Sequence, residues 1–319
     1  MPLFSKRVFP LPARQTPLFG NSAKTKYRKS DKMKDCHIHF MPQIGPADPQ
    51  EVFLKKADQA GITGGTIISL PPQSFRDDPE RSQHWRDRLD WILEYTEKTP
   101  GFHPFFWIDP TEKDAFEQIS TAAEKGVWGF KCICNHFFPK ECLKEFSAIS
   151  ETNLPVHFHT GILFDHYASS EFVRPLAYEC LLEVPGIRFA LAHVGNPWVD
   201  EYILLYAKFQ AAMLHSMGKR NLRMFIDLTP GVTRLRRKDM LRMLFLSGYA
   251  NPCNDILWGS DNRINNYAAL KTQNYLALDK TLISGIRQQT LADPEHYPQL
   301  PDDIWEKITD TNFNGFYGK

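Results

Sequence analysis

The chain has 319 residues, a formal net charge of +1 and a hydrophobic content of 42%. This composition predicts a folded chain with a large core, and the near-neutral charge gives no general attraction to nucleic acid or to an anionic membrane. No apolar run reaches the ~18 residues that a membrane-spanning helix needs, and the first residues lack the apolar core of a secretory signal. Six cysteines without a CxxC pair favour reduced thiols. We therefore expect a cytoplasmic protein without a membrane or nucleic-acid partner.

Residues 1–32 differ in composition from the rest of the chain. They contain eight Lys or Arg residues and a single acid, Asp31, without a clear hydrophobic period. We interpret 1–32 as a flexible basic N-terminal extension and 33–319 as one domain.

From residue 33 onward, short apolar runs alternate with longer segments of helical period. Bounding glycines and prolines, as in "PQEVFLKKADQAG" and "PTEKDAFEQISTAAEKG", mark helix ends. Strands are predicted at 34–39, 65–70, 103–109, 127–133, 154–159, 187–193, 223–228 and 255–261. Helices are predicted at 49–61, 81–98, 110–126, 139–152, 170–183, 198–218, 235–248, 268–290 and 302–318.

This alternation predicts an α/β fold with a parallel sheet and right-handed crossovers. An open doubly wound sheet is compatible with the pattern. The number of strands, eight, and the absence of GxGxxG after the first strand favour a single-domain (β/α)8 TIM barrel.

In such a barrel, active-site groups come from the carboxyl ends of the strands. Side chains alternate along a strand, so both histidines of "HIH", His37 and His39, should point into the barrel. Several other predicted strands also end in histidine, lysine or aspartate side chains. The imidazole and charged side chains at predicted strand ends are His37, His39, Lys131, His157, His159, His193, Asp227 and Asp261.

Several imidazoles and a carboxylate that converge at a barrel mouth are hard to satisfy by hydrogen bonds alone, which predicts a divalent metal. Nitrogen and oxygen ligands suit Zn²⁺, and also Mn²⁺, Fe²⁺ or Co²⁺. The alternative is that single strand-end histidines are structural, and His157, one layer deeper, could simply fill the core. His136 and His166 fall in loops after strands, where a substrate would lie.

The motifs "DCHIHF", "GFKC", "LPVHFHTG", "LAHVGNPW", "WGSDN" and "IWEKITDTNFNGFYG" occur in this order over residues 33–319. In this order the chain resembles the amidohydrolase superfamily, and more narrowly its amidohydrolase 2 branch, which includes aminocarboxymuconate-semialdehyde decarboxylase and related aromatic-acid decarboxylases, lactonases and hydratases. The resemblance implies a distorted barrel with one divalent metal, usually zinc. The ligands that it implies are His37, His39, His159 and Asp261.

The resemblance also implies roles for neighbouring residues. His193 and Asp261 would manage the proton of the attacking water, or His193 would bind a second ion. Lys131 would be an inward cation that faces the substrate, or a carboxylated lysine that bridges two metals. Arg263 could clamp a substrate carboxylate, or remain a solvated loop residue.

Three functions follow as hypotheses. The first is a metal-dependent hydrolase that attacks an amide, ester or lactone carbonyl of a small, carboxylated substrate. The second is a non-oxidative decarboxylase of an aromatic or muconate-like acid. The third is a barrel scaffold without catalysis, which a complete ligand set argues against. Family members are commonly dimers, so a homodimer is a further expectation.

Overall fold

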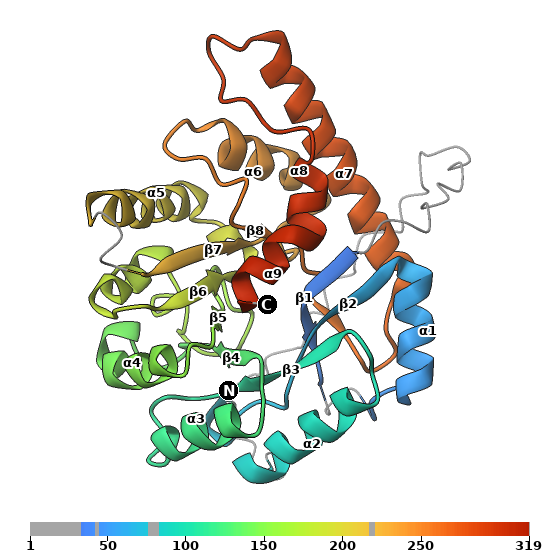
Figure 1. Cartoon of the computed structure of the whole chain (residues 1–319), viewed down its shortest axis with the longest axis vertical. Coiled ribbons are helices and arrows are strands. Elements are labelled where there is room, and N and C mark those ends of the chain that lie inside the picture. The colour runs from blue at the N-terminus through green and yellow to red at the C-terminus, as the bar shows by residue number, and fades with distance from the viewer. Residues whose placement is uncertain (1–32, 42–44, 76–82, 217–220, 319) are drawn as a thin grey trace, which may run out of the picture. The chain divides into compact units, whose positions relative to one another are not determined.

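The computed structural model describes residues 33–41, 45–75, 83–216 and 221–318, so the predicted basic extension lies outside the described residues. Within these ranges the strands form one nine-stranded parallel sheet in the order β8-β7-β6-β5-β4-β3-β2-β1-β9 (Figure 1). The α/β barrel prediction is confirmed. None of the helices in the described ranges has the length and apolar character needed to cross a bilayer.

The strands follow the predicted segments, with the largest difference at the end of the eighth, which was predicted to reach 261 but ends at Leu257 and is followed by a separate strand, β9. Their bounds are β1 Met33–His39, β2 Ile62–Ile68, β3 Phe102–Trp107, β4 Gly129–Cys132, β5 Val156–Phe158, β6 Arg188–Leu191, β7 Arg223–Asp227, β8 Ile256–Leu257 and β9 Asn262–Arg263.

The helices lie between the strands in chain order. Their bounds are α1 Gln50–Ala60, α2 Trp85–Glu97, α3 Ala115–Glu124, α4 Leu143–Glu151, α5 Val199–His215, α6 Arg234–Leu246, α7 Ala269–Ala292, α8 Ile304–Glu306 and α9 Asn312–Tyr317.

One predicted helix, 170–183, is shorter and tighter than expected. The chain forms a 3-10 helix there, Pro175–Glu183, instead of an α-helix. Pro175 has no backbone N–H and a fixed φ, so it suits only the first turn of a helix and cannot lie within one. The helix therefore starts at the proline.

The ring of strands closes through a split last strand. β8 pairs with β7, β9 pairs with β1, and the Cys36 N–H donates to the Trp258 carbonyl across the junction at 3.0 Å. Between the two pieces, Ser260 N–H donates to Asp35 Oδ1 at 2.9 Å, and Asp261 has a left-handed φ of 52°. The barrel is consequently distorted at the point where the predicted Asp261 ligand lies.

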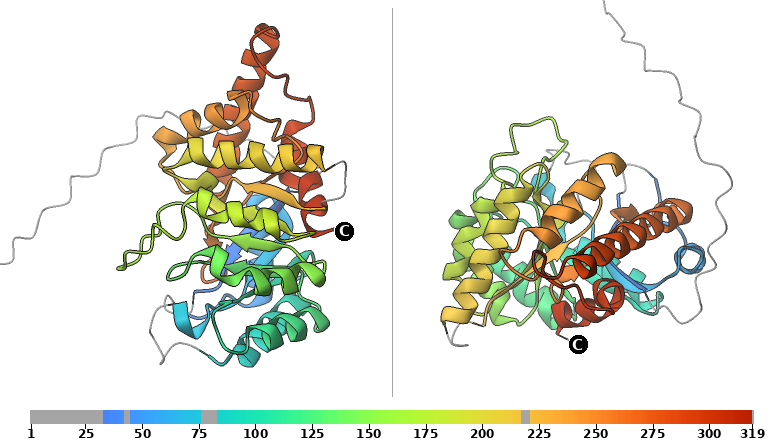
Figure 2. Two further views of the ribbon diagram at one scale, coloured as in Figure 1. Left: turned by 90° about the vertical axis from the view of Figure 1, so that its left-hand side faces the viewer. Right: turned by 90° about the horizontal axis from the view of Figure 1, so that it is seen from above.

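The amino end of the barrel is filled by the C-terminal helix, which lies across the centre of the ring (Figure 1). The ring of Tyr317 lies 5.8 Å from Trp128, which directly precedes β4, and Phe316 lies 5.0 Å from Phe225. Figure 2 shows the loop after β5 projecting at the opposite end from α9. Access to the barrel interior is therefore from the carboxyl end of the strands.

Candidate metal centre

The first strand is irregular at its centre, which changes the expected alternation. The register with β2 shifts between Asp35 and Ile38. As a result, the Cys36 thiol lies 3.5 Å from Asp227 Oδ1, while His37 Nδ1 lies 2.8 Å from Asp227 Oδ2. A bulge of this kind places two successive side chains on one face. Both Cys36 and His37 therefore face the barrel interior.

His37 and His39 direct the same ring atom toward one point. Their Nε2 atoms are 2.9 Å apart, and Asp261 Oδ1 lies 3.5 Å from His39 Nε2. The ligand-type atoms of these three residues all lie within 4.8 Å of one another. The structure thus brings together three of the four ligands that the resemblance implies.

The fourth implied ligand, His159, has its ring in contact with His193, and the His193 ring in turn is in contact with His37. The His193 ring is 5.7 Å from His37 and 4.8 Å from His159. In the described part of the chain, the buried Nε2 of His159 and the buried Nδ1 of His39 have no hydrogen-bond partner. A buried nitrogen without a partner is unfavourable, so the region around these imidazoles is suited to a further ligand.

Burial keeps these imidazoles neutral. It lowers the pKa of His37 and of His159 well below the usual value, and it lowers the pKa of His39 to about 3. The pKa of His193 is also lowered, again mainly by burial. Because a neutral imidazole is the form that binds a metal, the cluster is in its ligand state at neutral pH.

Asp227 is a fully buried carboxylate that collects donors from three strand ends. Its Oδ2 lies 2.8 Å from His37 Nδ1 and 2.9 Å from His157 Nε2, and its Oδ1 accepts the Thr229 N–H at 2.7 Å. Burial alone would raise the pKa of Asp227, but hydrogen bonds from His157 and His37 hold it well below its usual range. Asp227 therefore orients His37 so that Nδ1 donates to it and Nε2 faces the centre.

Lys131 is completely buried on β4, and its Nζ lies 3.3 Å from His37 Nε2. Burial lowers the pKa of this ammonium to about 8. Its amine thus lies beside the candidate ligands, deep in the barrel.

Arg263 faces the same side of the sheet as the ligands. It is the register partner of His39 in the β1–β9 pair, and neighbours in register share a face. Its neighbour Asn262 points the other way and donates to Thr272 on α7 at 3.0 Å. The exposed Arg263 side chain is thereby placed on the mouth side of the ring.

The backbone is strained where the site residues lie. His193, Val194 and Asp261 have left-handed φ values of 62°, 49° and 52°. Such conformations cost free energy in residues other than glycine, and they cluster at functional sites. Gly259 is required nearby, because a Cβ there would lie 2.9 Å from His37 Cβ.

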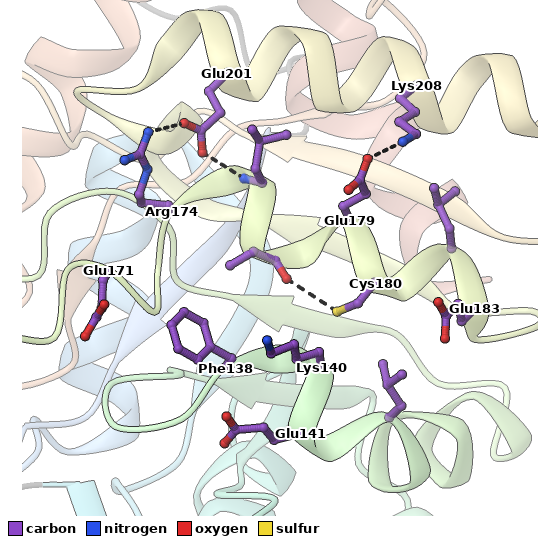
Figure 3. A pocket seen from close by; sticks show the side chains of 14 residues that line it. Phe138, Lys140, Glu141, Glu171, Arg174, Glu179, Cys180, Glu183, Glu201 and Lys208 are labelled. Carbon is purple, nitrogen blue, oxygen red and sulfur yellow. Dashed lines mark hydrogen bonds and ion pairs between the residues drawn. The ribbon is translucent and has the colours of Figure 1, made fainter.

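Two cavities bear on where a substrate would bind. One of about 1020 Å³ lies on the flank, between the segments 138–143 and 171–183 and α5, and none of the candidate ligands lines it (Figure 3). Its carboxylates Glu201 and Glu179 are paired with Arg174 and Lys208. A smaller cavity of about 510 Å³ lies among the loops after β2, β4 and β5. The chemistry favours this smaller one, because it is at the carboxyl end of the strands.

The residues present fit a divalent ion. Neutral imidazole nitrogens and one carboxylate oxygen are a donor set that suits Zn²⁺ and related metals.

Sequence reasoning placed Asp227 at a strand end but assigned it no role, and it assigned no role to Asp35. Burial raises the pKa of Asp35 to about 7. A carboxylate at the end of a buried strand was the only sign in the sequence that Asp227 could have a role. Its partners could not be identified, because they are about 70 and 190 residues away in sequence.

Comparison with known proteins gives a consistent picture. Residues 35–312 match the family model described as Amidohydrolase. No curated protein sequence matches the chain. A structure from Pseudomonas putida described as a 2-pyrone-4,6-dicarboxylic acid hydrolase is similar at a TM-score of 0.56 and 12% identity, covering 90% of this chain and 98% of that one.

Two further structures are similar in the same way. One, from Acinetobacter baumannii, is described as a 2-pyrone-4,6-dicarboxylic acid hydrolase with citric acid bound (TM-score 0.52, 12% identity, 90% of this chain and 100% of that one). The other is a dihydroorotase from Campylobacter jejuni (TM-score 0.51, 14% identity, 90% and 83%). At these identities the likeness establishes the fold.

Proposed function

Because the chain belongs to the amidohydrolase family, we propose that it is a metal-dependent hydrolase that acts on an amide, ester or lactone carbonyl of a small, carboxylated substrate. The observation that carries this proposal is the convergence of His37, His39 and Asp261 within 4.8 Å at the barrel mouth. Structurally similar proteins described as hydrolases of a dicarboxylic acid support a carboxylated substrate.

The proposed ligands are His37, His39, His159 and Asp261, for one divalent ion, with Zn²⁺ the first choice and Mn²⁺ an alternative. An ion held there would supply a Lewis acid and bring the pKa of a water molecule toward ~7. A second ion would require that Lys131 be carboxylated, since an ammonium has donors only and a carboxylated lysine would supply oxygen ligands.

Two residues are placed to move the proton of the attacking water. The Asp261 side chain is 39% exposed, so it is open to the mouth while it remains 3.5 Å from His39 Nε2. We assign to it the role of general base, which then donates the proton to the leaving group. His193 Nδ1 lies 3.4 Å from the Thr229 carbonyl; as a donor there, it leaves Nε2 free to accept a hydrogen bond from the same water.

We assign the binding of a substrate carboxylate to Arg263, whose guanidinium can form two parallel hydrogen bonds with it. Lys131 is the second proposed cation for the substrate if it is not carboxylated. Arg263 would place the anionic end of a substrate at the β9 side of the mouth, whereas Lys131 would bind it deeper in the barrel, beside His37.

The test begins with metal analysis of the purified protein, followed by turnover of carboxylated lactones, esters and amides. We expect one metal per chain, activity that a chelator abolishes, and a loss of about 100-fold to 10,000-fold in kcat for Asp261→Asn, measured at a metal concentration that saturates the variant. Two metals per chain would support a carboxylated Lys131.

The other hypotheses predict different results. Release of carbon dioxide without hydrolysis would support the decarboxylase reading. A metal-free protein that a chelator does not affect would leave only a scaffold. Full activity of Asp261→Asn would refute the role assigned to Asp261.

A further inference from the structure

The cavity of about 510 Å³ at the mouth is lined mainly by aromatic and polar side chains. We propose that it is a binding subsite for a planar ring that carries an uncharged hydrogen-bonding group. Three strand-end loops contribute its walls. They supply Ser74 and Phe75 after β2, Asn135 and His136 after β4, and Tyr167, Ala168 and Phe172 after β5.

The subsite adjoins the candidate metal centre. The Trp107 ring at the end of β3 lies 4.6 Å from Phe75, which lines the cavity, and 5.8 Å from His39. The loop that carries Tyr167 starts directly after His159 and projects at the mouth end (Figure 2). A ligand in the cavity would thus be separated from the candidate ligands by the width of one aromatic side chain.

The cavity walls are aromatic on more than one side. Phe75 is buried, Phe172 packs edge-on against Phe138 at 4.8 Å, and Tyr167 leaves 57% of its surface exposed. Aromatic rings favour offset or edge contacts with another ring, beyond the area that they bury. The three aromatic side chains that line the cavity therefore favour a flat apolar group.

The polar edge of the cavity is held in place by hydrogen bonds. Asn135 Nδ2 donates to the Phe75 carbonyl at 3.3 Å, and Asn135 Oδ1 lies 2.8 Å from His136 Nδ1. Ser74 donates to the buried carboxylate of Asp109. The Ser74 hydroxyl and the Asn135 amide, fixed in this way, can together accept from and donate to a neutral polar substituent.

The electrostatics disfavour an anion at this position. No Lys or Arg is among the residues that line the cavity in the described part of the chain, and Asp109 and Glu112 lie behind Ser74. The buried Arg88 does not line it, and donates instead to the carbonyls of Leu70 and Trp107. The carboxylate of a substrate would therefore bind toward Arg263.

The use of this subsite in catalysis rests on the proposed hydrolase function. With the ring in the cavity and the carbonyl at His39 and Asp261, the substrate class narrows to amides, esters or lactones that carry a flat ring on a spacer long enough to pass Trp107. The binding step itself does not depend on that function.

Three small probes separate shape from charge: benzamide, cyclohexanecarboxamide and benzoate, each titrated into the full-length protein by calorimetry. Benzamide has the ring and the neutral amide, cyclohexanecarboxamide has the same amide on a puckered ring, and benzoate has the ring with a charge. We expect benzamide to bind at least tenfold more tightly than either of the other two. Equal affinities, or no benzamide binding, would overturn the proposal.

Tyr167→Ala locates the site, and Tyr249→Ala is its matched control, because Tyr249 is a tyrosine of 65% exposure that does not line this cavity. Benzamide affinity should fall at least tenfold in Tyr167→Ala and remain unchanged in Tyr249→Ala. Unchanged affinity in Tyr167→Ala would refute this location.

The outcome can be told apart from failure of the hydrolase proposal. Benzamide binding that depends on Tyr167, without any hydrolysis, would retain the subsite and refute the hydrolase. Hydrolysis of small aliphatic amides, with benzamide binding indifferent to Tyr167, would retain the hydrolase and refute the subsite.

Discussion

Asp227 and Asp279 are both completely buried, but they lie in different layers and have different partners. Asp279, on α7, binds Arg237 of α6 through two hydrogen bonds of 2.8 and 2.6 Å and accepts from Trp258 Nε1 at 3.0 Å. Asp227, at the end of β7, binds the imidazoles of His37 and His157.

The partner decides what each carboxylate can do. An arginine keeps its charge and has donors only, so the Asp279 pair joins two helices to the barrel and offers no proton acceptor or metal ligand of its own. An imidazole has two nitrogens, so a carboxylate that binds one of them sets the chemistry of the other. The two carboxylates are equally buried, but they act differently. Asp279 stabilises the fold, whereas Asp227 sets the tautomer of the candidate ligand His37.

Asp279→Asn should have the largest effect on stability. It leaves the Arg237 guanidinium buried without its counter-charge, which costs about 3–5 kcal/mol. Urea denaturation measures this loss, and the metal affinity of the remaining folded protein should be unchanged. A fall in metal affinity as large as that of Asp227→Asn would erase the distinction between the two clusters.

Asp227→Asn should weaken the metal site by about 10-fold to 100-fold. The amide N–H of asparagine would face His37 Nδ1 and move the ring proton to Nε2, the atom assigned to the metal. Chelator competition measures the affinity, and ¹⁵N-detected NMR of the metal-free protein reports the His37 tautomer. A tautomer with Nδ1–H in the variant would contradict the assigned role.

Acid should act on the imidazole cluster in metal-free protein. The folded pKa of His37, His39 and His159 is below that of the unfolded chain, so the unfolded state takes up protons below pH ~6.5 while the folded state does not. Stability should then fall as pH decreases through this range, by about 1 kcal/mol between pH 7 and pH 6. Asp35, whose folded pKa is raised to about 7, opposes the loss.

Urea midpoints across pH 5–7.5 check this dependence. Asp35→Asn should make it steeper, because the opposing contribution disappears. A stability that is constant or rises toward acid would show that the imidazoles are already protonated in the folded protein.

Glu117→Gln supplies the smallest expected effect. Its partner Arg86 and Glu117 itself are both about half exposed, and solvent-exposed pairs contribute about 0.5 kcal/mol or less. A loss of stability above 1 kcal/mol would mean that the contribution of a charge pair to stability does not depend on burial in this protein. The comparison of the two buried clusters would then lose its basis.

Much of the fold could be read from local patterns. The eight predicted strands are present because each buried strand is a short apolar run bounded by turns, and that signal is local. Two features were not predictable locally. The split between β8 and β9 depends on Asp35 binding the Ser260 N–H, and the Cys36–His37 bulge depends on pairing with β2.

The site shows the same division. The order of strand ends indicated His37, His39, His159, His193 and Asp261 as a group, because a closed barrel brings all carboxyl ends to one rim. It did not indicate that the rings of His159 and His193 would be in contact, or that Asp227 would bind His37, since both depend on side-chain directions across the ring.

By itself the sequence determined the order of strands and helices and which residues reach the rim, because hydrophobic period and turn residues act over a few positions. Only the tertiary structure decided which imidazole nitrogen faces the centre, which carboxylate binds the other nitrogen of that ring, and where the mouth forms a cavity with aromatic side chains in its walls. Those features arise from contacts between residues far apart in the chain, whose distances and burial exist only after the ring of strands has closed.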